Sequence, residues 1–160
     1  MKNTVLVTLI LGLMASGGWW EYHRAQRPRL ANVAEYESDM TEGLLRGIFQ
    51  ELDEGEPLVY YVAFGQTRTS PSYGFIARFA DHVPAVQGFA LSVSPPTGVV
   101  LEASSGRTGV IIQIISFKAC APGGFDVLVA FSNLPSGHDR FIYRVFNNGG
   151  DWRIQSRKLA

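Results

Sequence analysis

The sequence has few of the residues that most often carry chemistry, since its 160 residues include one cysteine and three histidines. A single cysteine, Cys120, excludes an internal disulfide, and no second soft ligand lies near it to form a zinc or iron–sulfur motif. Cys120 follows the apolar run VIIQIISFKA, so we expect its thiol to be buried at the end of a strand. We therefore expect no metal and no cofactor.

The sequence also lacks an excess of either charge. Lys plus Arg and Asp plus Glu number 14 each, so no net field would attract nucleic acid. Neither a GxGxxG loop nor a Walker lysine loop is present, which removes the usual signals for nucleotide binding. A composition that is 46% hydrophobic and 18% charged is typical of one packed domain. We expect no nucleic-acid partner.

Charge is missing altogether from residues 3–20, which follow Lys2. This segment is either a cleaved signal peptide, with small residues Ala15 and Gly17 before the cleavage point, or an uncleaved membrane anchor. Trp19, Trp20 and Tyr22 resemble a membrane-interface belt and favour the anchor. Both alternatives predict export to the cell envelope, on the periplasmic or extracellular side, and the anchor would lie in the inner membrane.

The rest of the chain divides into a stalk over residues 21–32 and a single α+β domain over residues 33–160. Apolar residues at steps of three and four predict a helix over 33–54, in which Gly43 and Gly47 would allow close approach of a neighbouring element. A strand follows at 57–65, and a short helix at 71–81 with Ser70 as its N-cap. Short turns then separate strands at 86–93, 98–103, 110–118, 125–133, 140–146 and 151–157, which predicts a curved antiparallel meander packed on the helices.

The last two strands read FIYRVFNNGGDWRIQSR. Their alternation and the Asn-Asn-Gly-Gly turn predict a tight β-hairpin with Trp152 in the core. Together with TSPSYGFIARFAD and GGFDVLVAFSNLPSGHDRFIYRV, this hairpin resembles a widespread set of small bacterial exported domains of unknown function. The architecture is more distantly similar to NTF2-like and cystatin-like folds. The resemblance implies no catalytic residue.

Two functional hypotheses follow, and we prefer a non-catalytic envelope domain that binds a protein partner through its sheet. The alternative is a small-ligand-binding or enzymatic cone of the NTF2-like kind between helix and sheet. The residues that would line this cone are Tyr60, Tyr61, Arg78, His138 and Asp139. The two hypotheses differ in a testable way, because a cone needs several of these polar groups to converge, whereas aromatic residues such as Phe75 and Phe79 would otherwise fill the space.

Overall fold

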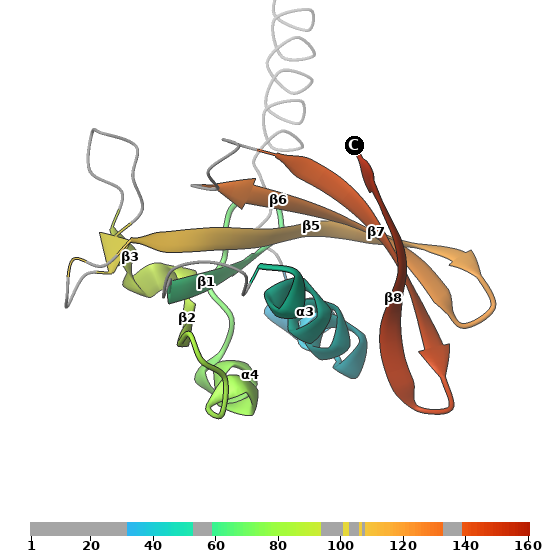
Figure 1. Cartoon of the computed structure of the whole chain (residues 1–160), viewed down its shortest axis with the longest axis horizontal. Coiled ribbons are helices and arrows are strands. Elements are labelled where there is room, and N and C mark those ends of the chain that lie inside the picture. The colour runs from blue at the N-terminus through green and yellow to red at the C-terminus, as the bar shows by residue number, and fades with distance from the viewer. Residues whose placement is uncertain (1–31, 53–58, 94–100, 103–105, 107, 133–138) are drawn as a thin grey trace, which may run out of the picture.

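The computed structural model describes residues 32–52, 59–93, 101–102, 106, 108–132 and 139–160. These residues form an α+β fold in which short helices accompany a mixed sheet of six strands (Figure 1). The α+β class is thus confirmed. The apolar segment 3–20 and most of the stalk lie outside the described residues.

The helix that the sequence predicts over 33–54 consists of two helices, α2 (Val33–Tyr36) and α3 (Asp39–Leu52). The break has a local cause, because the Ser38 hydroxyl accepts the Thr41 N–H at 3.3 Å and so occupies a capping position before α3. The carboxylate of Glu37, in the break, accepts hydrogen bonds from the backbone N–H and hydroxyl of Ser72. The prediction of one continuous helix is therefore wrong.

The sheet has the strand order β2-β1-β5-β6-β7-β8. Its strands are β1 (Val59–Phe64), β2 (Val86–Gly88), β5 (Gly109–Ala121), β6 (Gly124–Ser132), β7 (Arg140–Asn148) and β8 (Asp151–Leu159). From β5 to β8 consecutive strands pair antiparallel, as predicted. In contrast, β1 pairs parallel with both β2 and β5, so the expectation of a wholly antiparallel sheet is wrong at this end.

The segment between β1 and β5 differs from its prediction in two further ways. The second helix comprises α4 (Tyr73–Ile76) and the 3-10 turn η1 (Ala77–Phe79), and its N-cap is Ser72 rather than Ser70, since the Ser72 hydroxyl accepts the Phe75 N–H at 3.2 Å. The predicted strand 86–93 is divided by a second 3-10 turn, η2 (Phe89–Leu91). The short strand after it, β3 (Ser92–Val93), pairs with β4 (Leu101–Glu102) in a separate two-stranded sheet.

The hairpin of β7 and β8 forms as the sequence predicts. Gly149 and Gly150 adopt positive φ angles of 66° and 105°, and the Asn147 side-chain oxygen accepts the Gly150 N–H at 2.9 Å. Trp152 is half-buried and packs against the core.

Cys120 differs from expectation, because its thiol is exposed. The strand β5 continues past its last buried residue into the β5–β6 hairpin, and Cys120 lies in this exposed part.

The main core lies between α3 and one face of the sheet, which curves around the helix (Figure 1). From α3 it takes Leu44, Leu45, Ile48 and Phe49, all fully buried. The helix approaches β8 very closely. A Cβ atom placed on Gly43 would lie 2.8 Å from the backbone oxygen of Trp152, and one on Gly47 would lie 2.7 Å from the Ile154 Cδ1. The predicted role of these two glycines is confirmed.

Candidate functional site

Tyr60 and Tyr61 are neighbours on β1 and therefore point to opposite faces of the sheet. Tyr60 is 1% exposed and its ring stacks on Phe49 with centroids 4.8 Å apart. Tyr61 is fully buried on the other face, in a small cluster with Val59, Ala63 and Ile111. The two hydroxyl groups thus do not belong to one pocket.

Aromatic rings occupy the space in which the sequence allowed a ligand cone. Phe49 contacts Phe79 edge-on at 5.6 Å, and Phe75 contacts both Phe79 and Phe64 in the same manner. All four side chains are at most 2% exposed. Perpendicular rings at these distances are the packing that aromatic side chains favour in a core. The described interior between α3 and the sheet is therefore filled by side chains.

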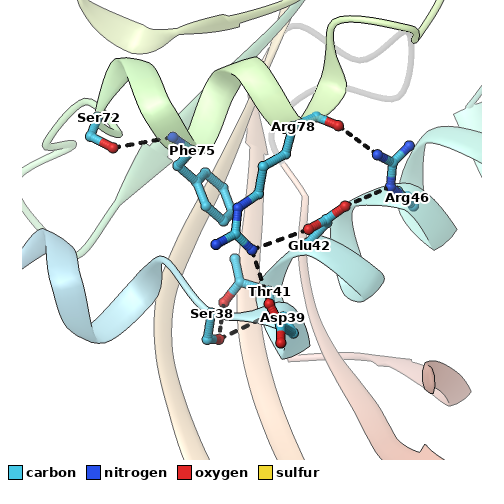
Figure 2. Close-up of polar contacts among 8 residues, drawn as sticks. All are labelled: Ser38, Asp39, Thr41, Glu42, Arg46, Ser72, Phe75 and Arg78. Atoms are coloured by element: carbon cyan, nitrogen blue, oxygen red, sulfur yellow. Dashed lines mark hydrogen bonds and ion pairs between the residues drawn. The ribbon is translucent and has the colours of Figure 1, made fainter. Parts of the chain in front are cut away.

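Arg78 lies on the surface in an ion-pair network that joins η1 to α3 (Figure 2). Its Nη1 atom donates to the carboxylates of Asp39 at 3.0 Å and Glu42 at 3.2 Å. Arg46 donates to Glu42 at 3.0 Å and to the backbone oxygen of Arg78 at 2.6 Å. The bonds to Asp39 and Glu42 raise the pKa of Arg78. These contacts give Arg78 a positioning role between two helical segments.

Asp139 begins the last hairpin, and its backbone oxygen accepts the Phe131 N–H at 2.8 Å. His138 lies outside the described residues, as do Trp19, Trp20 and Tyr22. Of the described residues proposed for the cone, Tyr60 thus lies in the core, Tyr61 on the opposite face of the sheet and Arg78 on the surface. Within the described ranges, the structure does not bring them together.

The edge of the sheet that β8 forms is the feature that sequence reasoning did not locate. In the described part of the chain β8 is the last strand of the order and pairs only with β7. The Ala160 N–H donates to the Arg140 oxygen at 3.0 Å. Because backbone groups alternate in direction along an antiparallel pair, the N–H and C=O groups of Leu159 and Arg157 point away from β7. These groups are a template for a further strand.

A groove of about 1020 Å³ runs beside this edge. It is lined by α3 residues between Asp39 and Glu51 and by residues 150–157. Arg157 crosses it, donating to the Glu51 carboxylate at 2.6 Å while its guanidinium lies 4.9 Å from the centre of the Phe141 ring. The strand that forms the sheet edge therefore also forms one wall of the groove.

Tyr143 connects this groove to the core. The residue is 1% exposed, and its hydroxyl donates to the Glu51 carboxylate at 3.4 Å. Burial is the main cause that raises the pKa of Tyr143 to about 12, and the nearby Glu51 charge acts in the same direction. The hydroxyl therefore stays protonated far above neutral pH, which fits a structural hydrogen-bond donor.

The composition of β8 was the sequence signal for this site. The run DWRIQSRKL carries three basic residues and one acidic residue, and such charge is common on strands at a sheet edge. The order of the strands in the sheet, however, cannot be predicted from any short run of residues. The sequence therefore showed the hairpin without showing that β8 borders solvent.

Comparison with protein-family models, with curated proteins and with solved structures found no match to this chain. Among the described residues, no group of histidine, cysteine and acidic side chains is arranged to hold a metal ion. None of the helices in the described ranges is long and apolar enough to cross a membrane.

Proposed function

We propose that this chain is a non-catalytic domain of the cell envelope that binds a protein partner by pairing an extended segment of that partner with β8. The observation that carries the proposal is the outer edge of this nine-residue strand, which pairs with no other described strand and lies beside an open groove. Addition of a strand to an exposed sheet edge is a general mode of peptide recognition. Main-chain hydrogen bonds would supply affinity, and the groove would receive alternate side chains.

The charge of β8 indicates the kind of segment that fits. Along β8 the three basic residues Arg153, Arg157 and Lys158 outnumber the one acidic residue, Asp151. Opposite charges on neighbouring strands stabilise pairing and like charges oppose it. The proposed partner segment is therefore extended and acidic. The alternative function, a small-ligand cone, has no comparable support because aromatic rings fill the interior beside Tyr60.

The proposed location rests on the uncharged segment 3–20 and on the resemblance to small bacterial exported domains. Cell fractionation followed by mass analysis of the intact chain tests this part. We expect the protein in the envelope fraction with Met1 to Trp20 retained as an anchor. A mature chain starting at Gly18 would replace the anchor by a cleaved signal peptide, and recovery of the protein in the cytosol would contradict the envelope assignment.

The edge itself can be tested with a matched pair of variants, Arg157→Pro and Arg157→Ala. Both lose the side chain that binds Glu51, but only proline removes the N–H that points to the free edge, and proline is tolerated at such edge positions. The probe is a displayed library of twelve-residue peptides selected on the full-length protein. We expect acidic peptides to be enriched. We also expect R157P to bind the selected peptides at least about tenfold more weakly than R157A does, because proline removes one or more of the hydrogen bonds between the strands.

Each variant is checked for the wild-type circular dichroism spectrum before binding is compared. Equal affinities of R157P and R157A for the selected peptides would show that the backbone edge is not the binding element. Selection without any preference for acidic peptides would contradict the proposed charge of the partner.

A further inference from the structure

A second groove lies where α2 and the start of α3 meet the β5–β6 hairpin and β8. Its volume is about 410 Å³, and its walls are the rings of Phe117, Phe125 and Trp152, with Met40 beside them. Met40 is 6% exposed, whereas the three rings are half-buried and keep part of their surface open. The groove is therefore lined by aromatic surface that the core leaves uncovered.

The three rings are set at different angles. Phe117 and Phe125 lie edge to face with centroids 6.3 Å apart, and Phe125 and Trp152 are tilted by 52° at 5.9 Å. The backbone of Trp152 lies in close contact with Gly43 of α3. Neighbouring rings are thus in contact along one wall of the groove, and the face of an aromatic ring attracts a cation within about 6 Å of its centre.

The charged groups that line this groove are both negative, and its third polar residue is Ser38. Its lining includes the carboxylates of Glu35 and Asp39, and among its described lining residues there is no basic side chain. Asp39 is 85% exposed and contacts Arg78, whereas Glu35 accepts a hydrogen bond from the Asn32 amide at 3.0 Å. Burial first, and then the charge of Glu35, raise the pKa of the adjacent Tyr36. The groove thus combines aromatic walls with an acidic rim.

We infer that this groove binds a small compound with a trimethylammonium group. Such a cation donates no hydrogen bonds, so it can enter an aromatic space without leaving donors unsatisfied. Aromatic faces attract its charge, and the carboxylates of Glu35 and Asp39 complement it. A primary ammonium or a guanidinium would bring several N–H donors, and only those that reach the rim carboxylates of Glu35 and Asp39 would find an acceptor, because the aromatic walls offer none. The inference adds a ligand site to the partner-binding edge of β8 and does not depend on that edge.

Choline is the probe, and 3,3-dimethylbutan-1-ol is its uncharged counterpart of the same shape. Binding of each is measured by NMR on the full-length protein in a maltoside detergent, which contains no ammonium group, by following the indole N–H of Trp152. This signal is identified as the one absent in Trp152→Phe. We expect the chemical shift of this N–H signal to change with choline concentration until it saturates. The alcohol should bind about tenfold more weakly, because it has no charge and therefore no cation–π attraction.

Two acidic residues of the same region provide matched variants. Glu35→Gln combined with Asp39→Asn is expected to weaken choline binding several-fold, whereas Glu37→Gln leaves it unchanged because Glu37 binds Ser72 and does not line the groove. The proline variant R157P must also leave it unchanged, which separates this site from the proposed strand edge. Absence of choline binding, equal affinity for choline and the alcohol, or full choline affinity in the double variant would each overturn the inference.

Discussion

Replacement of Gly43 by alanine is expected to lower the free energy of unfolding by about 2 kcal/mol, although alanine favours a helix over glycine by about 1 kcal/mol. The reason is steric. The added methyl group would lie 2.7 Å from the Cβ and 2.8 Å from the backbone oxygen of Trp152. Neither atom can move without shifting β8, so α3 must withdraw from the sheet. Urea denaturation followed by circular dichroism measures the change.

Gly47→Ala is the matched control for this prediction. Its methyl group would meet only the Cδ1 and Cγ1 atoms of Ile154, at 2.7 and 3.3 Å. The end of an isoleucine side chain can turn aside, so the helix preference of alanine offsets most of the cost and stability changes by less than about 1 kcal/mol. Equal losses for the two variants would show that backbone contact with β8 is not what requires glycine at position 43.

The second large effect concerns stability at alkaline pH. The pKa of Tyr143 is raised to about 12 in the folded protein from 10.0 for an unperturbed tyrosine. Below pH 10 both states keep the proton, and above it the unfolded state loses its proton first. The contribution of Tyr143 is therefore fully present below pH 10 and is lost as the pH rises towards 12, by about 2 kcal/mol.

Tyr143→Phe isolates this contribution, because phenylalanine keeps the ring and cannot ionise. We expect the stability of the wild type to fall more steeply than that of the variant between pH 10 and 12, as measured by urea denaturation at a series of pH values. At neutral pH the variant loses the contacts of the hydroxyl with Glu51, at 3.4 Å, and with Arg157. This loss lowers its stability by about 1 kcal/mol, and the test is the difference in slope between the two proteins. Parallel curves across the alkaline range would contradict the assignment.

Local patterns predicted the elements of this fold well where one short segment determines them. The Asn-Asn-Gly-Gly turn of the last hairpin and the close approach at Gly43 and Gly47 were both evident from residue type. The break at Ser38 was missed because the apolar spacing continues through it, although a serine before Asp39 is a usual start signal for a helix. Capping chemistry, rather than spacing, decided that boundary.

The parallel pairing of β1 was missed for a different reason. Short turns predict antiparallel neighbours, but they give no information on strands that pair across fifty residues, as Val59 and Gly109 do. A clue was present in the uniformly apolar run VYYVAF, every residue of which is buried. Strands that are covered on both faces have uniformly apolar sequences of this kind, and such strands are typical of parallel sheets.

The proposed sites show the same limit. Tyr60 and Arg78 were chosen as candidate ligand-binding residues by residue type, but Tyr60 packs in the core and Arg78 belongs to an ion-pair network. The aromatic groove joins Glu35, Phe117, Phe125 and Trp152 from four separate elements, so no spacing in the sequence could have indicated it. Only the arrangement of α2 beside the β5–β6 hairpin brings these side chains together.

The contact between α3 and β8 also has a consequence for how the domain is made. Its long helix comes near the start of the domain and β8 is its final strand, yet the two pack backbone against backbone at Gly43 and Trp152. During synthesis the side of α3 that packs on β8 stays uncovered until residues 151–159 have been made. β8 therefore completes the cover of α3, and a chain without β8 would leave the side of the helix that carries Gly43 and Gly47 uncovered.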